Sequence, residues 1–316
     1  MTKTWVAAMP RSHDACEASG LRLLSRQRHL LALLHALGEG VPKLDFQKFL
    51  FLYSQTRGDN APYEFVPYRF GAFSFTSYAD RRKLTERGLL ADEDTWQLTS
   101  EGRRLAVTID LPAVGDFVES HRHLGGDALV AESYRRFPYF ASRSEIATKV
   151  LGRDIAARRR ITAAMPRPNG APLMTIGYEG RSLESYINVL LTHGVNVLCD
   201  VRRNPISRKY GFSKRTLTTA CEGVGVRYAH LPELGIVGDR RQSLETQADY
   251  DRLFEEYERN DLPRQAEAIE SIRRMLESGE RVALTCYEQL PHQCHRHCVA
   301  EAVERCGKKP LTAVHL

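Results

Sequence analysis

Short apolar runs alternate with helical patterns through the second half of the chain, and this alternation limits the possible folds more than any other feature. The runs that read as strands are residues 173–177, 195–199, 226–232, 282–286 and 311–316. Apolar residues at helical spacing separate them at 183–193, 213–222 and 248–278. Parallel strands need a crossover connection, which is usually a helix. The order therefore predicts an α/β fold, with a parallel sheet that helices cover on both faces.

A proline-rich stretch divides the chain. Met165-Pro-Arg-Pro-Asn-Gly-Ala-Pro172 has the composition of a linker, and a chain of 316 residues is long for a single core. The predicted parts are a loose tail over residues 1–20, a mainly helical domain over 21–110, a helical arginine-rich connector over 111–164, a linker over 165–172 and an α/β catalytic domain over 173–316.

The first domain has the layout of a winged helix. Helical patterns at 21–37, 44–54 and 77–87 are followed by a hairpin-like element at 89–102, in the manner of helices with a small β wing. The segments Lys43-Leu-Asp-Phe-Gln-Lys-Phe-Leu-Phe-Leu52, Tyr68-Arg-Phe-Gly-Ala-Phe-Ser74 and Leu98-Thr-Ser-Glu-Gly102 resemble the SocA-like or Panacea family of antitoxin-associated domains over about residues 25–110. By analogy this resemblance implies a setting in phage defence, and either DNA or a protein partner for this domain.

The positive charge lies in the first half of the chain. Residues 1–170 hold 25 Lys and Arg against 19 Asp and Glu, and 20 of these cations are arginines, whereas residues 171–316 are balanced. Arginine suits bidentate contact with phosphate, so we expect DNA as a partner, with a solvated basic surface as the alternative. Aromatics interleaved with arginines at 134–140 could stack on bases.

Cysteine usage and hydropathy indicate a cytoplasmic protein. The seven cysteines are odd in number and fit reduced thiols better than a disulfide framework. No apolar run approaches the roughly 20 residues of a membrane helix, and Met1–Pro10 lacks the apolar core of a signal peptide. We expect no contact with a membrane.

Polar side chains follow each of the first four predicted strands. They are Tyr178 and Glu179 after the first strand, Asp200, Arg202 and Arg203 after the second, His230 after the third, and Cys286 and Glu288 after the fourth. Ligands of open parallel sheets bind outside the carboxyl ends of the strands, so we expect one shared site. The loop after Asp200 adds further cations that could hold phosphates without reading sequence, namely Arg208, Lys209, Lys214 and Arg215.

The segment from Cys286 to Cys298 allows three interpretations. Cys286 could be a thiol nucleophile with Arg296 at the start of a helix, as in a cysteine-dependent phosphatase or a sulfurtransferase. A metal site could use ligands among His292, Cys294, His295, His297 and Cys298, but paired C-x-x-C spacing is absent. In the third interpretation, which we favour, Glu288 is acid, base or nucleophile, His295 carries protons and Arg296 binds phosphate or carboxylate. We therefore expect no metal and no cofactor.

Several motifs of the second half resemble one family. They are Gly177-Tyr-Glu-Gly180, Asp200-Val-Arg-Arg-Asn-Pro-Ile-Ser-Arg208, Gly211-Phe-Ser213, Tyr228-Ala-His-Leu-Pro-Glu-Leu-Gly235, Cys286-Tyr-Glu288 and Cys294-His-Arg296. Together they are similar to the domain of unknown function 488 family over about residues 172–316. The resemblance implies a small Rossmann-like α/β domain with its marked residues at the strand ends, and no assigned reaction.

These features favour a hydrolase that acts on modified or damaged DNA. Asp200 and Glu288, facing each other across the sheet edge, suit hydrolysis at a sugar carbon, with Tyr178, Glu179 and His295 as further catalytic candidates. An extruded base would lie in a pocket lined by Tyr178, Tyr228 and Tyr287. We therefore predict a DNA glycosylase, in phage defence or repair. The alternatives are a nuclease, a DNA-binding sensor with a small anionic ligand, and the cysteine chemistry above.

Overall fold

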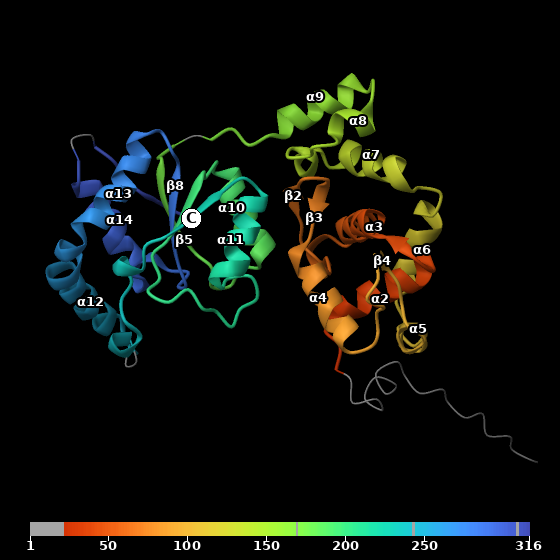
Figure 1. Ribbon diagram of the computed structural model, residues 1–316, viewed down its shortest axis with the longest axis horizontal. Coiled ribbons are helices and arrows are strands. Elements are labelled where there is room, and N and C mark those ends of the chain that lie inside the picture. The colour runs from red at the N-terminus through yellow and green to blue at the C-terminus, as the bar shows by residue number, and fades with distance from the viewer. Residues whose placement is uncertain (1–21, 169, 242–243, 308–309) are drawn as a thin grey trace, which may run out of the picture. The chain divides into compact units, whose positions relative to one another are not determined.

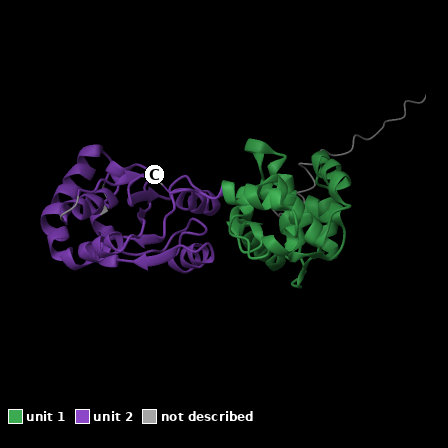
Figure 2. Cartoon of the chain, turned by 90° about the horizontal axis from the view of Figure 1, so that it is seen from above, with its two compact units in different colours: residues 1–163 green, residues 164–316 purple. Residues whose placement is uncertain are grey.

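The computed structural model describes residues 22–168, 170–241, 244–307 and 310–316, so the predicted tail over residues 1–20 lies outside the described residues. The chain forms two compact units, residues 1–163 and 164–316 (Figure 2). Among the described residues, none of the helices has the length and apolar character needed to cross a membrane.

The first unit is mainly helical. Its α-helices are α2 (Ser25–Leu37), α3 (Lys43–Gln55), α4 (Phe75–Glu86), α5 (Ser100–Val107), α6 (Pro112–His121), α7 (Gly126–Arg136), α8 (Ala147–Leu151) and α9 (Ile155–Ala164). Short antiparallel pairs join β1 (Val41–Pro42) to β4 (Thr95–Trp96) and β2 (Val66–Tyr68) to β3 (Gly71–Phe73). Helix α6 packs on α2 and α7 packs on α3, so residues 112–136 belong to the same unit as the helices before them.

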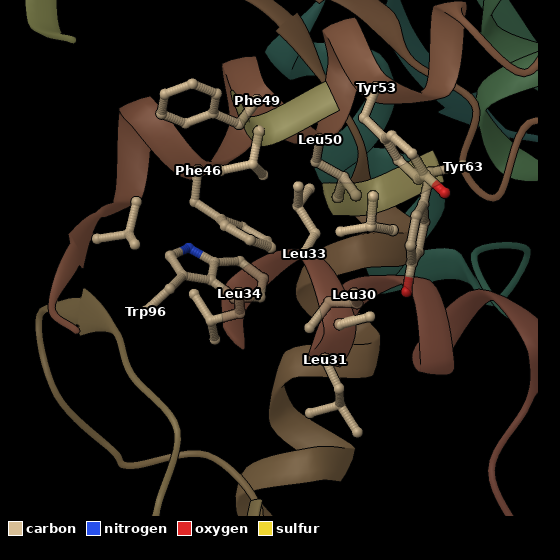
Figure 3. Close-up of a cluster of buried hydrophobic side chains, with 14 of the residues drawn as sticks. Leu30, Leu31, Leu33, Leu34, Phe46, Phe49, Leu50, Tyr53, Tyr63 and Trp96 are labelled. Atoms are coloured by element: carbon tan, nitrogen blue, oxygen red, sulfur yellow. The ribbon is translucent and has the colours of Figure 1, made fainter. Parts of the chain in front are cut away.

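The core of the first unit lies between α2 and α3 (Figure 3). The four leucines Leu30, Leu31, Leu33 and Leu34 are fully buried, because neighbours of α2 occupy more than one side of the helix. The Trp96 ring stacks on Phe46 with the ring centroids 4.4 Å apart. This contact joins the predicted wing element to α3, and Leu90 forms an antiparallel bridge with Leu98 inside that element.

The second unit is built on a five-stranded parallel sheet, which confirms the predicted fold class. Its strands are β5 (Leu173–Gly177), β6 (Val197–Asp200), β7 (Arg227–His230), β8 (Val282–Cys286) and β9 (Val314–His315), in the spatial order β7-β6-β8-β5-β9. Its α-helices are α10 (Leu183–Thr192), α11 (Lys214–Gly223), α12 (Gln247–Glu256), α13 (Ala266–Glu277) and α14 (Arg296–Arg305). The predicted helical stretch at 248–278 is interrupted by a π-helical turn at Tyr257–Asp261 and a 3-10 turn at Leu262–Gln265, which contains Pro263.

The strand order places β8 at the centre of the sheet. Helices α10 and α11 lie on one side of the sheet, and α12, α13 and α14 lie on the other (Figure 1). Helix α10 follows β5 and α11 follows β6, whereas α14 follows β8. The connections that leave β8 and its two neighbours therefore run to opposite faces. Such a point, where the winding changes direction, is where open α/β sheets commonly bind ligands.

Candidate active site

The polar residues at the strand ends separate into two clusters on opposite faces of the sheet. Asp200 pairs with Thr285 in the register of β6 and β8, and Thr285 Oγ1 accepts a hydrogen bond from Tyr186 of α10. Cys286 is the next residue of β8 and packs instead in the core that faces α12, α13 and α14. Successive strand residues point to opposite faces, so Asp200 and Cys286 lie on different faces of the sheet. Glu288 lies two residues beyond the end of β8, so its opposition to Asp200 across the sheet edge stays a prediction.

On the α10 side, Asp200 forms a buried ion pair with Arg202. The Asp200 side chain is fully buried, and Arg202 Nε and Nη2 donate to its two oxygens over 2.8 and 2.5 Å. The backbone N–H of Arg202 and the Tyr228 hydroxyl also donate to the carboxylate, over 3.1 and 2.6 Å. With both oxygens engaged, Asp200 is arranged to hold the loop after β6 rather than to take a proton from water.

Arg202 joins this ion pair to the aromatic residues beside it. Its Nη1 donates to the Tyr178 hydroxyl over 2.9 Å and to the Phe212 carbonyl over 2.8 Å. The Tyr178 and Phe212 rings are stacked with centroids 4.3 Å apart. Burial lowers the pKa of Arg202, but the hydrogen bonds and charge of Asp200 outweigh it and leave the pKa above its usual range. Burial, reinforced by the Asp200 charge, likewise raises the pKa of Tyr228. Phe212 was not among the predicted site residues, although it lies in the Gly211-Phe-Ser motif.

On the opposite face, Cys286, Cys294 and His295 lie together. Their ligand-type atoms all fall within 4.8 Å of one another, and all three residues are buried. His295 Nε2 lies 3.0 Å from the Val201 carbonyl, which can only accept, so this nitrogen carries the proton in the neutral ring. His295 Nδ1 then faces Cys286 Sγ at 3.8 Å. Burial raises the pKa of the Cys294 thiol to about 12.

Arg296 is a structural clamp in this arrangement. The side chain is fully buried, and its Nη1 and Nη2 donate to the carbonyls of Glu288 and Gln289. Its Nε donates to Thr175 Oγ1 over 3.3 Å. These contacts differ from the predicted binding of phosphate or carboxylate, because the guanidinium already holds the backbone of the loop after β8. Gly177 allows this close approach, since a Cβ there would lie 1.9 Å from the Glu288 carbonyl oxygen.

Half-buried and exposed groups after β5 and β8 lie at the solvent-accessible edge of the site. Glu288 is half-buried, and its Oε2 accepts a hydrogen bond from the Cys286 thiol over 3.5 Å. Glu179 Oε2 accepts from the Gln289 N–H over 3.0 Å, and the negative charge of Glu179 raises the pKa of Tyr287. Tyr287 is 45% exposed, and its ring lies edge-on to Tyr178. Solvent therefore reaches a carboxylate and an aromatic ring at the switch point of the sheet.

The loop between β6 and α11, together with the first turn of α11, carries the predicted cations, and we call this segment the cationic loop. Arg203, Arg208, Lys214 and Arg215 are exposed, which leaves them accessible to a large anion. Lys209 is half-buried, donates to the Tyr178 carbonyl over 3.0 Å, and has a pKa lowered by burial. His230 bridges the loop, with Nε2 donating to the Arg202 carbonyl and Nδ1 at 3.2 Å from Lys214 Nζ.

Two exposed apolar residues of this loop did not emerge from the sequence analysis. Ile206 is 76% exposed and Tyr210 is 37% exposed, between the cations of the loop. The signal available in the sequence was their position in a segment rich in Pro, Gly and cations, where no apolar periodicity requires burial. Gly235 supports the base of the loop, because a Cβ there would lie 2.0 Å from the Arg203 backbone nitrogen.

The matched family covers most of this site. The model of the family described as domain of unknown function DUF488 matches residues 182–303. The DUF488 segment contains β6, β7, β8, the cationic loop and the Cys286 to Arg296 region, which confirms the predicted resemblance over these residues. Tyr178 and Glu179 precede it. No curated protein and no solved structure matches the chain.

Proposed function

We propose that this protein is a DNA-acting hydrolase that removes a modified or damaged base by hydrolysis of the N-glycosidic bond. The proposal rests on two features that follow neighbouring strands of the parallel sheet: the exposed cationic loop after β6 and a half-buried carboxylate, Glu288, after β8. Exposed cations can bind the phosphates of DNA, and a partly desolvated carboxylate can act as a base or stabilise a cationic sugar.

Glu288 takes the central catalytic role in this proposal. It would orient a water molecule toward C1′ of the sugar and accept its proton, while the bond from C1′ to the base breaks and the base leaves with the electron pair. Asp200, predicted as a catalytic residue, and Arg202, predicted to bind phosphate, support the site in this proposal instead. Their ion pair fixes the loop that would hold the DNA backbone.

The aromatic and apolar groups fit an extruded base. Tyr287 presents an exposed ring on which a base can stack, and Ile206 can enter the base stack as an apolar wedge. A wedge lowers the cost of unstacking the target nucleotide, and the flanking cations Arg203 and Arg208 would hold the phosphates on either side.

We extend the proposal to the first unit, as a DNA-binding module with a winged-helix-like layout that acts in phage defence or repair. Its helices, its two short antiparallel strand pairs and the arginine excess of residues 1–170 support this part. A protein partner for this unit is the alternative. Unchanged DNA binding by Arg-to-Ala variants of the unit would favour it.

The experiment is incubation of the full chain with duplexes that carry a panel of modified bases, followed by alkali, which cleaves the strand at abasic sites. We expect cleavage with at least one duplex for the wild type and none for Glu288→Gln. Glu280→Gln is the matched control, because Glu280 precedes β8 at its other end, where it pairs with the exposed Arg227. Absence of abasic sites with every duplex, or full activity of Glu288→Gln, would overturn the proposal.

A further inference from the structure

We infer that Cys286, Cys294 and His295 form a binding site for one zinc ion. Two sulfur atoms and one imidazole nitrogen lie within 4.8 Å of one another in a buried setting. Thiolate and imidazole are the ligands that zinc prefers, and magnesium and calcium prefer oxygen.

The distances and the second contacts of the ligands fit such an ion. Tetrahedral zinc with ordinary bond lengths to sulfur and nitrogen holds these two ligands about 3.6 Å apart, and Cys286 Sγ lies 3.8 Å from His295 Nδ1. Metal-binding histidines usually donate the other ring N–H to a carbonyl or carboxylate, which fixes the tautomer. His295 does so through Nε2 to the Val201 carbonyl.

The ligands also stand on firmly held elements. Cys286 is the last residue of the central strand β8, and Cys294 and His295 directly precede α14. The buried guanidinium of Arg296 holds the intervening loop through its carbonyls at Glu288 and Gln289. The ligand positions are therefore set by the fold, which is a condition for tight metal binding.

The fourth position of the metal would lie beside Glu288. Its Oε2 is 3.5 Å from Cys286 Sγ, and the side chain is only half-buried, so water can reach it. Three protein ligands with one open position are typical of a catalytic zinc, which lowers the pKa of its bound water. Glu288 would accept the proton of that water. Metal binding is measured without DNA, so this inference stands or falls separately from the proposed base release.

Metal content of the full chain tests the inference. The protein is purified with a reducing agent, stripped with a chelator, dialysed against zinc and analysed by mass spectrometry of the metal. We expect about one zinc per chain for a three-ligand site of this kind, and with cobalt a thiolate-to-metal absorption band. Cys294→Ser should weaken zinc binding about tenfold or more. Cys221→Ser is the control, because Cys221 is buried in α11, on the other side of the sheet.

Three results would overturn the inference. One is a wild-type chain that retains no more zinc than an unrelated protein without cysteines. This outcome does not depend on the folding of any variant. Another is equal zinc binding by Cys294→Ser and Cys221→Ser. The third is a disulfide between Cys286 and Cys294 that persists in the presence of the reducing agent. Peptide mass spectrometry would detect it, and it would remove two of the three ligands.

Discussion

Replacing Asp200 with asparagine should destabilise the second unit strongly. The substitution keeps the shape of the side chain but leaves the buried guanidinium of Arg202 without its counter-ion. Asparagine can still accept at one oxygen, so Arg202 Nε keeps a partner, whereas Nη2 and the Tyr228 hydroxyl face an amide group. Loss of one charge-assisted hydrogen bond costs about 1.5–3 kcal/mol, and removing one partner of a buried ion pair costs about 3–5 kcal/mol in all.

The assay is urea denaturation of the full chain followed by two signals. Trp96 is buried in the core of the first unit, and residues 164–316 contain no tryptophan, so a tryptophan fluorescence transition follows the first unit, whereas far-ultraviolet circular dichroism follows both units. We expect the circular dichroism transition of the second unit to move to lower urea while the fluorescence transition stays in place. Tyr228→Phe removes one hydrogen bond to the same carboxylate and should show a smaller shift. An Asp200→Asn chain with unchanged transitions would refute the structural role of the ion pair.

Three further predictions concern other parts of the chain. Burial lowers the pKa of Lys48 from 10.5 to about 7, so the unfolded state binds more protons between these pH values. The stability of the first unit should therefore rise with pH across that window by on the order of 5 kcal/mol, and Lys48→Met should abolish this rise in tryptophan-monitored unfolding. Arg208→Ala and Arg215→Ala should each reduce the slope of log affinity for duplex DNA against log salt by about 0.9, and Arg227→Ala, which removes an exposed cation near the start of β7, should leave that slope unchanged. Gly177→Ala should cost about 1–3 kcal/mol and displace the loop after β8, measured by unfolding and by base release, whereas Gly115→Ala, with open space around its Cβ, should do neither.

Part of the second unit could be predicted directly from the sequence, because β5 and β8 are continuous apolar runs bounded by turn residues. The runs at 173–177 and 282–286 correspond to β5 and β8 residue for residue. The strand order could not be predicted in this way, since an apolar run carries no information about its pairing partner. In the structure β8 lies at the centre of the sheet, where α13 and α14 pack against it.

The unknown pairing of the strands also explains which features of the site could not be predicted. Whether Asp200 and Cys286 share a face depends on the register of β6 against β8, where a shift of one residue reverses the answer. Cys286 and Cys294 lie eight residues apart, outside the usual metal-ligand spacings, and only the turn after β8 brings them together. The burial of Arg296 could not be predicted either, because an arginine at the start of a helix is a typical ligand for anions.

The proposal that Glu288 hydrolyses a glycosidic bond in DNA is tested most directly by the identity of the product. Duplexes with modified bases are incubated with wild-type protein, Glu288→Gln or Glu280→Gln, and the free bases and strand lengths are measured by mass spectrometry under single-turnover conditions. We predict that wild type and Glu280→Gln release a free base and leave the strand intact, and that Glu288→Gln binds the duplex but releases none. Release of a base by Glu288→Gln at the wild-type rate, or strand breaks without any free base, would contradict the account.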